Sequence, residues 1–250
     1  MEAAFLDGTP GEAIIEVGAG LGVLTAELAK QAHRVVAVEV DRGLAGYLER
    51  RLAAFGNVAV VCADVLALSP AQLLEKGGAG PPYAVVGNLP YNIGAPVLRH
   101  FLESDPPPTR LVVMLQREVA ESVASAPGRM SLLGVSVQLY GSARLLFGVP
   151  PRAFYPPPKV RSAVVRVDVA PSPRADIPDR QLFFEVVRAG FSAPRKQLRN
   201  ALAQGLAVPP AEAAALLEEA GVAPTRRPQE LRLEEWAALS RAWTRRLPGP

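Results

Sequence analysis

Short apolar runs alternate with segments of helical periodicity over the first 115 residues, and this alternation constrains the fold more than any other feature. The apolar runs lie at residues 13–17, 35–40, 58–61, 83–86 and 111–115. Helical patterns follow several of them, most clearly at 42–54 and 96–102. Apolar strands that alternate with helices predict βαβ units, and therefore a mostly parallel sheet with helices on both faces.

The remaining half of the chain predicts the end of this sheet and then a helical region. Residues 118–125 have a helical pattern, and 135–140 and 163–169 are predicted as late strands. Residues 171–178 have the composition of a linker, and helical patterns follow at 182–189, 195–204, 210–220 and 233–243. We therefore expect a larger α/β domain over 1–175 and a smaller helical domain over 176–250.

Several classes of protein are disfavoured by the sequence. No run of about 18 apolar residues is present, so no transmembrane helix is predicted. The first ten residues carry acidic side chains and no apolar stretch follows them, which is unlike a secretory signal. The single cysteine, Cys62, excludes a disulfide framework or a cysteine-based metal site, and we expect it to be a buried thiol. A cytoplasmic protein is the resulting prediction.

Charge is distributed unevenly along the chain. The net charge is −4 over residues 1–143 and +7 over residues 144–199. A basic block beside a slightly acidic region is typical of a chemical domain that adjoins a surface for a polyanion. A solvated surface without a partner is the alternative.

A glycine-rich turn, Gly18-Ala19-Gly20-Leu21-Gly22, follows the first predicted strand. Glycines permit a sharp turn and a close approach of the backbone to a bound nucleoside. The dinucleotide fingerprint requires glycine at 18, 20 and 23, but position 23 is valine. The G-x-G-x-G spacing, preceded by Glu16, favours S-adenosylmethionine instead.

Two further acids support this interpretation. Glu39 ends the second predicted strand, where a carboxylate can accept both ribose hydroxyls, and Asp64 follows the third, where it can accept an adenine amino group. Either acid could instead cap a helix, a role that Asp41 fits better than Glu39 does. Because the carboxyl ends of successive parallel strands meet at one edge of a sheet, we expect these groups to share a crevice.

The fourth predicted strand ends in Gly87-Asn88-Leu89-Pro90-Tyr91-Asn92, which resembles the motif of amino-adenine methyltransferases. Adenine N6 is a poor nucleophile because its lone pair is delocalised into the ring. An acceptor side chain on Asn88 and the carbonyl of Leu89 can hold the two N6 hydrogens and favour a pyramidal nitrogen. Pro90 fixes the turn, and Tyr91 offers a face for a flipped base.

Phe154 is a candidate second stacking face, since neighbouring prolines make its segment rigid; a core role is the alternative. The candidate catalytic residues are therefore Asn88, Leu89, Tyr91 and Phe154. His33 and His100 have no partners that would indicate a metal site or a nucleophile. No metal is predicted.

With these residues in view, the chain resembles the ribosomal RNA adenine dimethylase family. Besides the glycine turn and the Asn-Leu-Pro-Tyr segment, the resemblance rests on four stretches of sequence. They are Leu115-Gln116-Arg117-Glu118-Val119-Ala120, Phe154-Tyr155-Pro156-Pro157-Pro158-Lys159-Val160, Ser162-Ala163-Val164-Val165-Arg166 and Arg195-Lys196-Gln197-Leu198-Arg199-Asn200. The ensemble looks more like the small-subunit members than like the macrolide-resistance members.

The resemblance implies a Rossmann-like class I methyltransferase sheet of seven strands with a helical C-terminal domain. It implies transfer of two methyl groups to each of two adjacent adenosines near the 3′ end of 16S rRNA, within the small ribosomal subunit or its precursor. It assigns cofactor contacts to Gly18, Glu39, Asp64 and Asn88, to which the glycine turn adds Glu16 and Gly20. It further assigns RNA phosphates to Arg195, Lys196 and Arg199, and we expect a monomer without membrane contact.

The resemblance also raises competing interpretations. Members of the family carry an N-terminal Gln-Asn-Phe-Leu segment that closes over the cofactor; Phe5-Leu6-Asp7 is not that motif, so this chain is expected to lack it. A non-catalytic ribosome-assembly factor is one alternative. An adenine methyltransferase that acts on large-subunit RNA or on DNA is another.

Overall fold

A computed structural model describes residues 11–247 as two compact units. The first unit comprises residues 11–121 and 142–171, and the second comprises 122–141 and 172–247. The segment Phe5-Leu6-Asp7 lies outside the described residues. Within 11–247, no helix is both long and apolar enough to cross a membrane.

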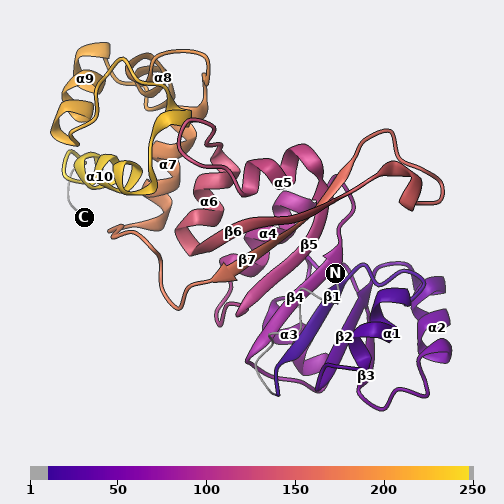
Figure 1. Cartoon of the computed structure of the whole chain (residues 1–250). Coiled ribbons are helices and arrows are strands. Elements are labelled where there is room, and N and C mark those ends of the chain that lie inside the picture. Colours follow the sequence, from indigo (N-terminus) through magenta and orange to yellow (C-terminus); the bar gives the residue numbers. More distant parts are fainter. Residues whose placement is uncertain (1–10, 248–250) are drawn as a thin grey trace. The chain divides into compact units, whose positions relative to one another are not determined.

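One seven-stranded sheet forms the centre of the first unit (Figure 1). Its strands run in the order β3-β2-β1-β4-β5-β7-β6. They are β1 (Ala13–Val17), β2 (Arg34–Glu39), β3 (Val58–Cys62), β4 (Tyr83–Asn88), β5 (Arg110–Gln116), β6 (Gly141–Val149) and β7 (Ser162–Val169). Neighbours from β3 to β5 are parallel, whereas β7 is antiparallel to β5. The predicted α/β fold class, with a mostly parallel sheet, is confirmed.

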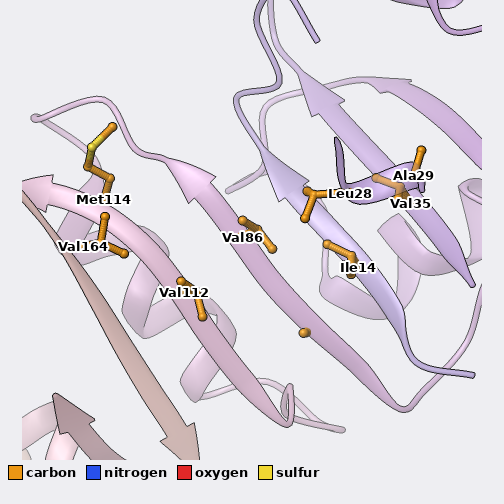
Figure 2. Close-up of a cluster of buried hydrophobic side chains, with 9 residues drawn as sticks. Ile14, Leu28, Ala29, Val35, Val86, Val112, Met114 and Val164 are labelled. Atoms are coloured by element: carbon orange, nitrogen blue, oxygen red, sulfur yellow. The ribbon is translucent and has the colours of Figure 1, made fainter. Parts of the chain in front are cut away.

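The central strands are largely apolar because helices cover both of their faces. Figure 2 shows side chains of β1, β4, β5 and β7, among them Ile14, Val86 and Val112, on one face of the sheet together with Leu28 of α1 (Val23–Ala29). The helix α2 (Arg42–Arg51) adds Leu48 to a second cluster around Ala37 of β2. The other helices of this unit are α3 (Pro70–Lys76), α4 (Gly94–Leu102) and α5 (Arg117–Val123).

Cys62 is exposed, so the expectation of a buried thiol was wrong. The strand β3 lies at the edge of the sheet, and Cys62 is its last residue. Apolar neighbours in the sequence indicate a strand, but they do not show whether that strand is central or at an edge.

The prediction of a strand at 135–140 was also wrong, because these residues belong to the helix α6 (Leu132–Tyr140). The hydroxyl of Ser131 caps this helix by accepting the N–H of Gly134 at 2.9 Å. Six of the nine residues of α6 are buried, and its one exposed residue, Leu132, is apolar, so its sequence shows no charged face from which a helical period could be read. The sixth strand is β6, which begins directly after it.

The second unit is a bundle of helices. Besides α6 it contains α7 (Arg180–Phe191), α8 (Leu198–Gly205), α9 (Pro210–Glu219) and α10 (Leu233–Thr244). Its core includes the fully buried Trp236, which packs so closely on α7 that a Cβ at Gly190 would lie 2.4 Å from the indole. The predicted domain limits of 1–175 and 176–250 differ from the division into units, because α6 belongs with the later helices.

Candidate active site

The glycine turn joins β1 to α1 in a conformation that side chains rarely adopt. Gly18, Gly20 and Gly22 have φ angles of 71°, 58° and 74°. At Gly22 there is also no room for a side chain, since a Cβ would lie 2.6 Å from Cδ2 of Leu48. The N–H of Gly18 donates to the carbonyl of Val38 at 2.9 Å, which fixes the turn against the end of β2.

Glu39 is buried at the end of β2 with both carboxylate oxygens directed at backbone N–H groups. Oε2 accepts the N–H of Gly20 at 2.9 Å, and Oε1 accepts the N–H of Asp41 at 3.0 Å. Each oxygen retains acceptor capacity after this bond. The alternative role of helix cap falls to Asp41, whose Oδ1 accepts the N–H of Leu44 at 2.8 Å at the start of α2.

Asp64 lies in the turn that follows β3. Its Oδ1 accepts the N–H of Leu66 at 3.0 Å, and this bond holds the side chain in one orientation. Oδ2 makes no hydrogen bond to any residue that the structure describes. This oxygen is therefore available to a ligand.

A cavity of about 400 Å³ opens at the carboxyl ends of β1, β2, β3 and β4. Gly18, Glu39, Asp64 and Asn88 all line it, as does Pro90. Its volume is within the usual range for a small-molecule site. The structure thus brings together four of the six predicted cofactor residues in one hollow, which we call the cofactor cavity.

The segment after β4 is held in place by the backbone. The N–H of Leu89 donates to the carbonyl of Met114 in β5 at 3.1 Å, and the N–H of Ile93 donates to the carbonyl of Pro90 at 3.1 Å. Gly87 is required here because a Cβ would lie 2.7 Å from the carbonyl oxygen of Val17. Asn88 leaves the sheet at this point with an exposed side chain beside the cofactor cavity.

Tyr91 has a fixed orientation although its side chain is partly exposed. Its hydroxyl is 2.9 Å from Oγ of Ser162, a residue that is 1% exposed at the start of β7. No feature of the sequence marks Ser162 as a site residue. A serine at the start of an apolar strand is common, and only the pairing of β7 with β5 brings it to Tyr91.

Phe154 is half-buried and follows the short 3₁₀ turn Pro151–Ala153. It packs against the cluster of Figure 2, which contains Met114, the residue opposite Asn88 in β5. The position is consistent with a core role as well as with a stacking face. Tyr155, the next residue, is fully exposed.

Glu16 lies in β1 and does not line the cofactor cavity, and neither does Gly20. Glu16 is 2% exposed, and its Oε2 has no hydrogen-bond partner within residues 11–247. Burial raises the pKa of Glu16 from 4.5 to about 7, and the neighbouring Thr25 hydroxyl offsets part of that rise. Near neutral pH a large share of this side chain is therefore protonated.

We expect the stability of the protein to depend on pH through Glu16. Below pH 4.5 Glu16 is neutral, and its burial does not lower the free energy of unfolding. As the pH rises through about 7 the free energy of unfolding falls, because the charged form is costly to bury. At roughly 1.4 kcal/mol per pKa unit, this cost reaches about 3 kcal/mol at high pH. The measurement is urea unfolding of the native chain and of Glu16→Gln, both without ligand, at pH 5 and at pH 8. Between these pH values the native chain should lose most of this amount of unfolding free energy relative to Glu16→Gln. An equal difference at both pH values would contradict the assignment.

The three predicted RNA-binding residues lie apart from this site in the chain, around the start of α8 in the second unit. Arg195, Lys196 and Arg199 are all exposed. Among the described residues, no group of three or more His, Cys, Asp or Glu side chains could hold a metal ion. His100 instead contacts the carbonyl of Leu68 through Nε2 at 3.0 Å.

Comparison with known proteins identifies close relatives. The family model described as ribosomal RNA adenine dimethylase matches residues 3–244. A protein of Dehalococcoides mccartyi (strain ATCC BAA-2266 / KCTC 15142 / 195) named ribosomal RNA small subunit methyltransferase A is 45% identical over 94% of this chain and 80% of its own length. A protein of the same name from Bacillus cereus (strain B4264) is 40% identical over 91% of this chain and 80% of its own length.

Two solved structures cover almost the whole chain. The crystal structure of the 23S rRNA methyltransferase ErmE has a TM-score of 0.74 and 28% identity, and it covers 96% of this chain and 94% of its own. A dimethyladenosine transferase from Plasmodium falciparum has a TM-score of 0.77 and 22% identity, over 94% of this chain and 90% of its own. The second of these supports the fold alone.

Proposed function

Because the chain belongs to the ribosomal RNA adenine dimethylase family, we propose that it transfers methyl groups from S-adenosylmethionine to N6 of two adjacent adenosines near the 3′ end of 16S rRNA. The similarity to small-subunit methyltransferases over more than nine-tenths of the chain carries this proposal. The cofactor cavity beside Asn88 supplies a matching site. We place the activity in the cytoplasm and expect a monomer that needs no metal.

The residues of the cofactor cavity fit S-adenosylmethionine. Glu39, held by two backbone N–H groups, can accept the two ribose hydroxyls. The unpaired Oδ2 of Asp64 can accept an adenine amino group. The turn at Gly18 brings the backbone close to the ligand without side chains in the way, and Asn88 closes the cavity towards the target base.

Asn88 and Leu89 position the nucleophile. The amide oxygen of Asn88 and the carbonyl oxygen of Leu89 accept the two hydrogens of adenine N6, which favours a pyramidal nitrogen with its lone pair directed at the methyl group. Leu89 can do so reproducibly because its own N–H is tied to Met114 of β5. Tyr91, fixed by Ser162, and Phe154 provide the faces between which the base stacks.

The chain supplies orientation rather than a strong base. When bound, S-adenosylmethionine supplies a methyl group on a cationic sulfur that is already activated for displacement. The attacking nitrogen becomes cationic as it is alkylated, and it then loses its proton to water. Asn88 and Leu89 accept hydrogen bonds that become stronger as positive charge develops on that nitrogen.

We expect Arg195, Lys196 and Arg199 to bind RNA phosphates. Neutralising all three should weaken binding to the small subunit and lower the slope of log Kd against log salt by about 2 to 3, since each phosphate contact contributes roughly 0.7–0.9. The measurement is a salt titration of binding for the native chain and the triple glutamine variant. An unchanged affinity and slope would rule out this surface. Replacing Arg245 and Arg246, which pair with Glu219, by glutamine provides a control that removes two positive charges elsewhere on the same unit.

One observation favours a second target. The likeness to ErmE, at 28% identity over nearly the full chain, keeps adenine in large-subunit RNA as an alternative substrate. A non-catalytic role in ribosome assembly is the other alternative. Neither has a relative here as similar as the small-subunit methyltransferases.

The deciding experiment combines purified chain, labelled S-adenosylmethionine and ribosomal subunits that lack the modification, followed by mass analysis of nucleosides. Dimethyladenosine in 16S rRNA, mapped to adjacent positions, is the expected result. Label in 23S rRNA alone would establish the second target. Binding to small subunits without any methyl transfer would support the assembly role instead.

A further inference from the structure

A second cavity adjoins the Asn-Leu-Pro-Tyr segment at the same edge of the sheet. It has a volume of about 410 Å³, and we call it the flanking cavity. Its lining includes Arg117 on α5, Leu145 and Phe147 on β6, Arg161 directly before β7, and Ser162, the first residue of β7. A smaller hollow of about 250 Å³ shares Arg117 and Arg161 with it.

The flanking cavity is next to the proposed target-base site, because Ser162 lines the cavity and contacts Tyr91. Ser162 pairs with Gln116 at the carboxyl end of β5, the edge at which Asn88 also ends β4. The buried hydroxyl of Ser162 bonds to Tyr91, so the wall of the flanking cavity and the proposed stacking face are joined by one hydrogen bond. If one unit of a bound polymer stacks on Tyr91, the next unit along that polymer would therefore lie close to Ser162.

The lining of the flanking cavity combines an exposed aromatic ring with two guanidinium groups. Phe147 is 48% exposed and Leu145 is 45% exposed, although both lie on a strand of the central sheet. The guanidinium of Arg161 makes no hydrogen bond or ion pair to the residues that the structure describes. Arg117 uses only Nε, which donates to Glu121 at 2.6 Å, so its two terminal nitrogens have no partner in that same part of the chain.

The surrounding charge favours an anionic occupant. No Asp or Glu occurs between Glu121 and Asp168, whereas Arg144, Arg152 and Lys159 lie in that stretch in addition to Arg161. The two carboxylates on α5, Glu118 and Glu121, are therefore outnumbered. A protein segment that docked through apolar contacts would use Leu145 and Phe147, but it would not require this excess of positive charge.

We propose that the flanking cavity binds the nucleotide adjacent to the target adenosine in single-stranded RNA, with its base stacked on Phe147 and its phosphate held by Arg161 and Arg117. Stacking on an aromatic ring beside guanidinium groups is the general way in which proteins bind single strands without reading their sequence. The inference rests on the proposed function, since the adjacent nucleotide is defined by the one that enters the methylation site. The cavity would hold the strand in register while one base is presented.

The test is a set of variants at Phe147 and Arg161, assayed for kcat and KM on small subunits lacking the modification, with saturating S-adenosylmethionine. Phe147→Ala and Phe147→Leu should each raise KM for the subunit about tenfold, whereas Phe147→Trp should stay within about twofold of native because it retains the stacking face. Arg161→Gln should raise KM and lower the salt slope by about 0.7, the value for one phosphate of a single strand. Arg50→Gln, an exposed charge on α2, is the matched control.

Each outcome distinguishes this inference from the proposed function. Unchanged affinity for S-adenosylmethionine and unchanged thermal unfolding in the variants show that a rise in KM is not a structural defect. A native KM in Phe147→Leu would overturn stacking in favour of an apolar contact. Native KM in both Phe147→Ala and Arg161→Gln, with an active native chain, would overturn the inference and leave the function standing.

A direct binding measurement applies even if the native chain transfers no methyl group. Phe147→Trp introduces an indole at the cavity, and a short single-stranded oligoribonucleotide with paired adenosines should quench its fluorescence relative to the native chain. Quenching that is lost in Phe147→Trp combined with Arg161→Gln supports the site. An absence of quenching at saturating oligoribonucleotide overturns it.

Discussion

Replacing Asn88 with alanine should lower kcat for methyl transfer by about a hundred- to a thousandfold, the scale on which removal of one positioning or charge-stabilising group acts. The alanine leaves one hydrogen of adenine N6 without an acceptor, so the nitrogen is no longer held with its lone pair towards the methyl group. The carbonyl of Leu89 remains, but one acceptor does not define the orientation. Nucleoside analysis of small-subunit RNA after a single turnover measures the loss.

The fold should survive this change. The side chain of Asn88 is exposed and makes no hydrogen bond to any residue that the structure describes, so the free energy of unfolding should change by less than about 0.5 kcal/mol. Asn88→Asp is the matched variant, because it keeps an acceptor at the same place and should retain more activity than alanine does. Native activity in Asn88→Ala would remove this residue from the proposed mechanism.

Replacing Glu39 with alanine should raise the Kd for S-adenosylmethionine about a hundredfold, since two charge-assisted hydrogen bonds are lost at roughly 1.5–3 kcal/mol each before compensation by water. The change also removes the acceptor that ties Gly20 to the end of β2. Glu39→Gln keeps one oxygen and should show a smaller rise. Isothermal titration of the cofactor into each variant provides the values.

Asp41 supplies the control for Glu39, because it lies two residues away and carries the same charge. Its side chain caps α2, so Asp41→Ala should reduce stability by about 1 kcal/mol while leaving the cofactor Kd near its native value. An equal loss of cofactor affinity in the Asp41 and Glu39 variants would mean that the net charge of this region matters, and not the contact of Glu39 with the ribose.

The sequence predicted the sheet and the grouping of several polar residues at one of its edges, because both depend on local pattern and on one rule of topology. Parallel strands buried on both faces appear as continuous apolar runs, as in β2 and β4. Their carboxyl ends must lie at one edge, so an acid or amide placed directly after such a run falls into a common crevice. For this reason the order of residues along the chain is enough to group Glu39, Asp64 and Asn88, and all three line one cavity.

Features that depend on contacts between distant segments could not be predicted in this way. The helix α6 looked like a strand because its residues are mostly apolar and mostly buried, and only the packing of the second unit makes that burial possible. Cys62 looked buried, but the strand order places β3 at an edge. Glu16 belongs to the glycine motif by sequence, yet its carboxyl group is buried and has a raised pKa.

The sequence by itself thus determined the fold class, which residues meet at one cavity, and the segment proposed to receive the target base. Only the tertiary structure decided that Ser162 fixes Tyr91, and that Phe147 and Arg161 form a cavity beside it. The physical reason is that β7 is antiparallel to β5. This reversal brings Ser162, which follows Tyr91 by 71 positions, to the edge of the sheet at which Asn88 lies, and no local pattern in the sequence records it.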